Sequence, residues 1–283
     1  MALFNRAAPA VDPEGRMSFM EHLGELRTRI VWSLVAVLVG LGAAFPFSEK
    51  IMIYLARPIT KTGQTLKFLA VTEAFWAQMK IALITGLFVA SPVILWQVWR
   101  FVEPGLHRYE KKYAVPFILV GSLLFLGGGA FALFVVTPYA IQFLLTYSKP
   151  GVLEASITIG NHIDFILKFT LAFGAVFELP LAITLLARMG VVNAKMLARN
   201  RKYAILGAFV AAAVLTPTPD IFNQTLMAGP LIILYEVGII SARIFGRRPS
   251  APPPAASNGQ PPDGEAVSSP PPATPADQPT VGS

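Results

Sequence analysis

The chain has 283 residues, of which 54% are hydrophobic and only 14% charged, and its formal net charge is +7 at pH 7. Soluble domains carry about 25% charged residues, so this composition argues against a soluble protein and favours a membrane protein. There is no cysteine, which excludes disulfide bonds and thiolate metal sites. The basic residues are divided among several segments beside apolar runs, which argues against nucleic-acid binding.

Six apolar runs are candidates to cross a bilayer, which takes about 20 residues of helix. A capping box of Ser18 and Glu21 predicts that the first helix begins at Ser18, before the membrane. The fifth run has only about 13 apolar residues, roughly 20 Å of helix against a hydrocarbon core of about 30 Å. We therefore expect the last two spans to be short. The runs are 30–47, 81–101 (starting near Glu73), 113–136, 163–189, 203–215 and 221–245.

Basic residues are concentrated before the first run, between the second and third, between the fourth and fifth, and after the sixth. By the positive-inside rule both termini are cytoplasmic. The first outer loop is an exception, because it carries Lys50, Arg57, Lys61 and Lys67. The sequence therefore predicts an all-α polytopic membrane protein with six transmembrane helices and both termini in the cytoplasm.

Three regions follow from composition. Residues 249–283 are rich in Pro, Ala, Ser and Gly, and 1–17 are similar, so neither segment buries enough apolar surface to offset its ordering entropy. We predict disordered ends and one membrane domain, 18–248. This domain is expected to be helical, since only helices and closed barrels satisfy their backbone in lipid and the runs are too long for barrel strands.

Glu178 is the clearest candidate for a functional side chain, because it lies near the middle of the fourth run in "AFGAVFELPLAITLL". A carboxylate there costs about 2.5–3.5 kcal/mol unless it is protonated, paired or hydrated. Pro180 removes a backbone hydrogen bond and predicts a kink beside it. We favour a functional role, either contact with a partner or a water-filled cavity. A structural bond between helices is the alternative.

Three polar positions at the sixth run have structural interpretations. Asp220, in "LTPTPDIF", has the residue type and place of a helix N-cap. Gln224, one turn later, shares its face and is expected to bond to a neighbouring helix. Glu236 lies seven residues before Arg243 on the same face, which predicts a pair that reaches the inner surface.

Charged residues at the inner side have two interpretations. The loop 99–113, "WRFVEPGLHRYEKKY", places Glu103 and Glu110 among basic residues, and "EHLGELRTRI" (21–30) precedes the first run. Composition alone favours solvated topology signals, yet a carboxylate among lysines stays ionised and ready to bind a cation. We find no catalytic set, phosphate-binding loop or metal-ligand cluster, so the sequence predicts no enzyme activity, cofactor or metal.

Four segments in order give the chain a family resemblance. It resembles TatC, the multispanning subunit of the twin-arginine protein translocase, over nearly all of residues 18–248. The family topology of six spans, with both ends inside and the last two helices short, agrees with the prediction. One departure is "YEKK", where arginines often follow the glutamate. The segments are "FMEHLGELRTRI", "SPVILWQVWRFVEPGLHRYEKKYAVPFI", "FGAVFELPLAI" and "LTPTPDIFNQTLMAGPLIILYEVG".

The resemblance implies a receptor in the cell inner membrane. Family members bind the twin-arginine signal peptide of folded precursor proteins at the cytoplasmic face, and bind TatA and TatB within the bilayer. Further TatC copies are expected partners, and the proton-motive force drives transport. By motif position, Glu25 and Glu110 would contact the signal peptide, with Arg27 and Phe101 supporting them. Positions implied in partner contact or transport are Pro58, Glu178, Asp220 and Gln224.

Two other classes of protein share some of these sequence features. A proton-coupled secondary transporter of a small molecule also places a carboxylate at mid-membrane depth, but the two halves of the chain do not align as inverted repeats. An intramembrane enzyme needs a catalytic set facing a cavity, and the carboxylates here are isolated in the sequence.

Overall fold

The structure is a computed structural model that describes residues 19–61, 64–105, 114–147, 157–216 and 220–246. These residues are helical or in connecting segments, apart from an isolated bridge between Lys67 and Thr158. The predicted disordered segments 1–17 and 249–283 lie outside the described residues, as does Ser18 of the predicted capping box.

The first two predicted spans are present as long helices. The first helix, α1 (Phe19–Ala44), continues through a short turn, η1 (Phe45–Phe47), into α2 (Ser48–Thr60). The helix α2 lies in the predicted first outer loop, and it contains Pro58. After the loop, α3 (Glu73–Val102) begins at the predicted residue and is followed by η2 (Glu103–Gly105).

The third span does not end at residue 136 as predicted. The helix α4 (Ala114–Phe131) passes through a π-helical turn, η4 (Ala132–Val136), into α5 (Thr137–Leu145). Pro138 lies in the first turn of α5, where a missing backbone donor is tolerated. A π-turn inserted before a proline changes the hydrogen-bond register, which allows the helical path to continue.

The fourth span is interrupted at Glu178, where Pro180 predicted a kink. It consists of α6 (Ile159–Phe177) and α7 (Leu179–Arg188), with Pro180 in the first turn of α7. The short α8 (Ala194–Arg199) leads to α9 (Arg201–Leu215), which has 15 residues and is about 22 Å long. The last helix, α10 (Ile221–Phe245), has the predicted bounds.

Five helical segments in the described part of the chain are long and apolar enough to cross a membrane. They comprise α1 with α2, α3, α4 with α5, α6 with α7, and α10. The remaining predicted span, α9, is too short to meet that length, in line with the expectation that it is a weak span.

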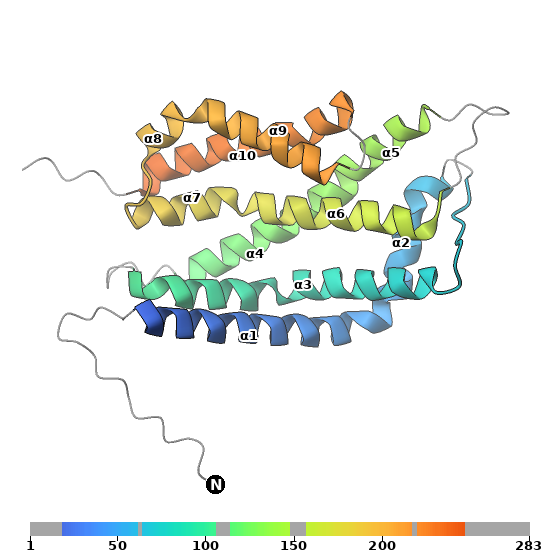
Figure 1. Cartoon of the computed structure of the whole chain (residues 1–283), viewed down its shortest axis with the longest axis horizontal. Coiled ribbons are helices and arrows are strands. Elements are labelled where there is room, and N and C mark those ends of the chain that lie inside the picture. The colour runs from blue at the N-terminus through green and yellow to red at the C-terminus, as the bar shows by residue number, and fades with distance from the viewer. Residues whose placement is uncertain (1–18, 62–63, 106–113, 148–156, 217–219, 247–283) are drawn as a thin grey trace, which may run out of the picture. The chain divides into compact units, whose positions relative to one another are not determined.

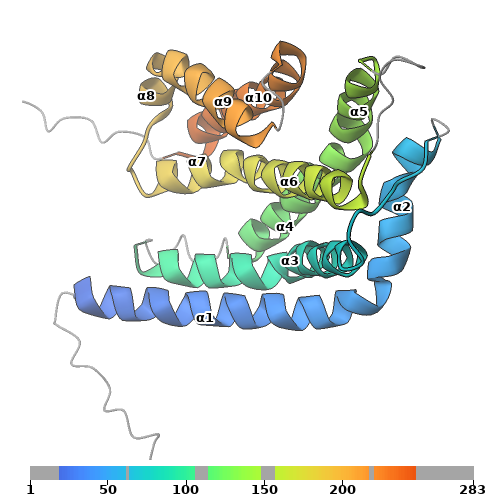
Figure 2. The ribbon, with the colours of Figure 1, turned by 45° about the vertical axis from the view of Figure 1, so that its right-hand side comes forward.

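The helices share two ends, seen in Figures 1 and 2. At one end, here named the α8 end, α1 begins, α3 and α7 finish, and α8 lies beside them. At the opposite end, named the α2 end, α2 turns away from α1 and α6 begins. Within the bundle α1 packs along α3, and α4 packs against both α3 and α6.

Glycines permit two of these helix contacts. A side chain at Gly40 would meet the Gly86 carbonyl, and one at Gly86 would meet the backbone of Leu41. A side chain at Gly128 would likewise meet the Phe173 carbonyl, which joins α4 closely to α6. Small residues let helix backbones approach in lipid, where van der Waals contact replaces the hydrophobic effect as the force between helices.

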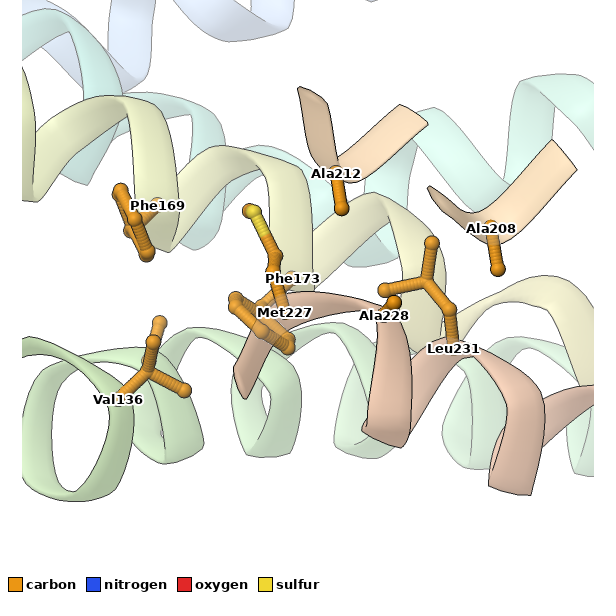
Figure 3. Close-up of a cluster of buried hydrophobic side chains, with 9 residues drawn as sticks. Val136, Phe169, Phe173, Ala208, Ala212, Met227, Ala228 and Leu231 are labelled. Carbon is orange, nitrogen blue, oxygen red and sulfur yellow. The ribbon is translucent and has the colours of Figure 1, made fainter. Parts of the chain in front are cut away.

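The largest buried cluster joins α6, α9 and α10, and includes residues of η4 (Figure 3). Phe169 and Phe173 of α6 are fully buried against Met227 of α10. Two alanines of α9, Ala208 and Ala212, complete the cluster with small side chains. The short α9 is therefore attached to the bundle by packing along α6 and α10.

Candidate functional site

The start of α1 and the end of α3 meet at the α8 end. The rings of His22 and Phe101 stack there with centroids 4.3 Å apart and planes 17° from parallel. Phe101 is half-buried, whereas Arg27 is exposed. The structure thus brings two predicted site elements, the charged lead-in of α1 and Phe101, to one place. Glu110 lies outside the described residues, so its position relative to Glu25 is untested.

Glu25 forms an ion pair with Arg29 one turn later in α1. Arg29 Nη2 donates to Glu25 Oε1 at 2.7 Å, and the two side chains are only 21% and 17% exposed, respectively. Glu25 Oε2 and Arg29 Nε are also buried, and neither has a hydrogen-bond partner within the described residues. The pair is therefore half-satisfied, with one acceptor and one donor left over.

A groove of about 380 Å³ runs between α1 and α3 beside this pair. Its walls are mostly apolar, and they include Arg29, Gln97 and Phe101. Gln97 Oε1 is buried and, like the two atoms above, has no partner in the described part of the chain. Unpartnered buried polar atoms are uncommon and costly, so their concentration beside one groove indicates a place for a polar ligand or a rearrangement.

Glu178 lies at the break between α6 and α7 and is half-buried. A β-carbon at Gly121 of α4 would lie 3.3 Å from Glu178 Oε2, so the carboxylate approaches α4 where that helix has no side chain. Glu178 Oε1 is buried and finds no hydrogen-bond partner among the described residues. A structural bond between helices is therefore not seen for this oxygen.

The structural interpretations of Asp220 and Gln224 are confirmed. Asp220 caps α10, because its Oδ1 accepts from the Asn223 backbone at 2.7 Å. Gln224 Nε2 donates to the Phe209 carbonyl of α9 at 3.1 Å, so it bonds to the neighbouring helix as expected. The Gln224 bond ties α9 to α10, and α10, with 25 residues, is not short as was expected for the last two spans. Pro58 is half-buried within α2, far in the sequence from both.

The predicted partnership of Glu236 with Arg243 is wrong. Glu236 pairs instead with Arg201 at the start of α9, through Nε–Oε1 at 2.7 Å and Nη2–Oε2 at 2.8 Å. Seven residues are about 10.5 Å of helix, which is too far for a direct ion pair, whereas an adjacent helix brings a guanidinium within reach.

Sequence reasoning missed a set of polar contacts at the α2 end. Glu73 accepts from the backbone of Leu69 at 2.8 Å and of Gly160 at 2.7 Å. Lys80 Nζ lies 2.7 and 2.9 Å from the two oxygens of Asp164. The available signal was the opposite charge of Lys80 and Asp164, each near the start of an apolar run. Among the described residues, no three His, Asp or Glu side chains are placed to hold a metal ion.

Taken together, long apolar helices, glycine-mediated contacts and a half-buried carboxylate at a helix break define a multispanning α-helical membrane protein. The family model described as Sec-independent protein translocase protein (TatC) matches residues 21–230. The chain belongs to the TatC family.

Individual relatives agree with this assignment. The chain is 44% identical over 238 residues to the TatC protein of Desulforapulum autotrophicum, covering 83% of this chain and 87% of that one. It is 37% identical over 235 residues to that of Escherichia coli K12, covering 82% and 90%. A crystal structure of the twin-arginine translocase receptor TatC matches with a TM-score of 0.71 and 41% identity, covering 79% of this chain and 98% of that one.

The protein is accordingly a membrane-embedded subunit of the twin-arginine translocase. It is a component of a protein-transport system, with the role of a receptor and not of an enzyme. Membership in this family leaves no support for the proton-coupled small-molecule transporter that was considered from the sequence.

Proposed function

We propose that Glu25 and Glu110 bind the paired arginines of twin-arginine signal peptides, with Arg27 and Phe101 supporting the site. The observation that carries this proposal is the state of Glu25. Its carboxylate lies among basic residues at the α8 end, and one of its oxygens has no partner in the described residues. A buried carboxylate oxygen with an open acceptor position suits a guanidinium from outside the chain.

The chemistry favours arginine over other cations. A guanidinium is planar, permanently charged and matched to a carboxylate by two parallel hydrogen bonds. A lysine ammonium supplies the charge without the fork. The surrounding basic residues repel a generic cationic segment, so two local carboxylates provide selectivity against an unfavourable background.

In this proposal the α8 end faces the cytoplasm, both termini are cytoplasmic, and α9 and α10 are the fifth and sixth spans of a membrane domain at 18–248. Basic residues at membrane edges support this orientation. A span as short as α9 is compatible with local thinning of the bilayer. The proposed location is the cell inner membrane. The described basic residues at the α8 end are Arg27, Arg29, Arg100, Arg188, Lys195, Arg199, Arg201, Lys202 and Arg243.

Within the bilayer, the proposed partners are TatA, TatB and further copies of TatC, and transport is driven by the proton-motive force. Glu178 supports this part, because a half-buried carboxylate with an unbonded oxygen is able to accept from a polar group on a partner helix. Pro58, Asp220 and Gln224 are proposed to serve partner contact or transport through the segments that they position.

Cross-linking of a photoreactive twin-arginine signal peptide in membrane vesicles tests the proposal. Glu25→Gln and Glu110→Gln should each weaken peptide binding roughly tenfold or more, since each removes a charge-assisted contact. Glu236→Gln is the matched control, because that carboxylate is already paired with Arg201. Undiminished cross-linking to Glu25→Gln, with the protein inserted normally, would overturn the assignment.

The same vesicles separate the two proposed sites. Glu178→Ala should keep peptide cross-linking and reduce co-purification of TatA and TatB, because Glu178 lies at the break of α6 and α7 and not at the α8 end. Loss of peptide binding together with normal partner assembly would contradict this division.

A further inference from the structure

Arg29 presents to Glu25 the same chemical group that the proposed ligand would bring. Its guanidinium donates to Glu25 Oε1 at 2.7 Å, from a position four residues later on the same helix. We propose that Arg29 is an internal stand-in for the signal-peptide arginine, and that it transfers to Gln97 when the peptide binds. This inference rests on the proposed function and concerns the regulation of that same site.

The contact between Arg29 and Glu25 is suited to exchange with an incoming guanidinium. A monodentate pair uses one of the carboxylate's two oxygens, whereas an arriving guanidinium can engage both with its fork. Both side chains are largely buried, with 21% and 17% exposure for Arg29 and Glu25, so the pair is shielded from water more than a surface pair. Displacing Arg29 therefore exchanges one guanidinium for another in the same environment, at the cost of finding a second acceptor for Arg29.

Gln97 supplies that second acceptor. Arg29 and Gln97 both line the groove between α1 and α3, from opposite helices. Arg29 Nε is a buried donor and Gln97 Oε1 a buried acceptor, and neither is bonded within the described residues. In the proposed transfer, a change in the Arg29 side-chain torsions brings Nε to Gln97 Oε1, so that each atom gains a partner.

As an internal competitor for Glu25, Arg29 should weaken the binding of peptides. It lowers the apparent affinity for every cationic peptide by the same factor, because each must first release Arg29 from Glu25. Arg29 would then set a threshold for entry, while the choice between arginine and lysine stays with the fork geometry of Glu25. This role differs from that of the exposed basic residues, which act on peptides through long-range repulsion.

Binding of a fluorescent twin-arginine signal peptide to the purified full-length protein in lipid nanodiscs provides the test. Arg29→Gln should tighten binding roughly 3- to 10-fold, the range expected for removing one partly buried ion pair. A twin-lysine peptide should tighten by a similar factor, leaving the ratio of the two affinities unchanged. Lys80→Gln is the control, because it removes a paired positive charge at the α2 end, away from this groove; it should leave both affinities unchanged.

Gln97→Met distinguishes transfer from simple release. In the wild-type background it should weaken peptide binding several-fold, because displaced Arg29 loses its acceptor, and in the Arg29→Gln background it should have no effect. If Arg29→Gln is poorly folded by thermal unfolding, Arg29→Lys serves in its place, with a smaller tightening of about twofold because lysine lacks the fork.

The outcomes are separable from those of the proposed function. If wild-type protein binds the twin-arginine peptide and Glu25→Gln does not, the site stands. If Arg29→Gln then binds the peptide as well as wild type or more weakly, the stand-in role is overturned. Arg29 would in that case be structural, or would share the carboxylate with the ligand. Equal effects of Gln97→Met in both backgrounds overturn the transfer step. Failure of wild-type protein to bind would instead remove the proposed function itself.

Discussion

Glu25 at the α8 end is less completely hydrogen-bonded than Glu73 and Asp164 at the α2 end, and less than Glu236 at its own end, whose two oxygens both contact Arg201. At the α2 end, both oxygens of Glu73 accept backbone hydrogen bonds, and both oxygens of Asp164 contact Lys80. At the α8 end, Glu25 has one oxygen bonded to Arg29 and the other buried without a partner in the described residues.

This difference suits Glu73 to hold parts of the fold together, and it leaves Glu25 able to accept a further hydrogen bond. A carboxylate with both oxygens satisfied fixes the elements that it joins, and Glu73 joins the segment before α3 to the start of α6. A buried carboxylate oxygen without a hydrogen bond lowers the stability of the fold, and a ligand that donates to this oxygen removes that cost. Satisfied contacts therefore join segments at the α2 end, whereas Glu25 at the α8 end keeps the open acceptor position that the proposed peptide binding requires.

The largest effect is expected at the close contact between α1 and α3, where a change should disturb both ends of the bundle. Both ends depend on this contact, and a β-carbon at Gly86 would overlap the backbone of Leu41. Gly86→Ala should destabilise the protein by about 1–3 kcal/mol through overpacking. The measurement is the Tm of the detergent-purified protein. Gly42→Ala is the control, because nothing lies within 4 Å of its added carbon; equal Tm values for the two variants would refute the close contact.

A change confined to Glu73 should show whether the α2 end is independent of the α8 end. Glu73→Ala removes the acceptor for the Leu69 and Gly160 backbone donors, which should release the segment 64–72. Limited proteolysis of this segment should accelerate, while affinity for the signal peptide at the α8 end stays unchanged. Glu49→Ala, at an exposed acid of the α2 end, should leave the proteolysis rate as it is in the wild type. A parallel loss of peptide affinity in Glu73→Ala would show that the two ends are coupled.

The smallest effect is expected for the ion pair between α3 and α6. Lys80 and Asp164 are 46% and 38% exposed, so screening reduces their coupling to about 0.5 kcal/mol. A double-mutant cycle with Lys80→Gln and Asp164→Asn measures this coupling as the non-additive part of the stability change. A coupling of several kcal/mol would mean that the pair, and not Glu73, is the main connection at the α2 end.

Local sequence signals predicted much of the fold. The bounds of α10, the start of α3 and the interruption at Glu178 all follow from apolar run length or from a proline in the chain. The Asp220 cap was also predicted, because a cap is decided within four residues. The Glu25–Arg29 pair has the spacing of a helical ion pair, so it was within reach of the sequence although it was not predicted.

Contacts between distant helices were not predictable in the same way. The partner of Glu236, the stacking of His22 on Phe101 and the bond from Gly160 to Glu73 join residues 35 to 87 positions apart. Which helices become neighbours depends on where glycines allow two backbones to touch, and a single sequence carries many glycines whose partners it does not specify.

The sequence by itself determined that this chain enters a membrane, where its helices run and which acidic residues are unusual for their positions. Only the tertiary structure decided which of those acids are satisfied and which keep an open oxygen. The physical reason is that insertion depends on the summed hydropathy of a local run, whereas hydrogen-bond satisfaction depends on atoms that distant segments bring within about 3 Å.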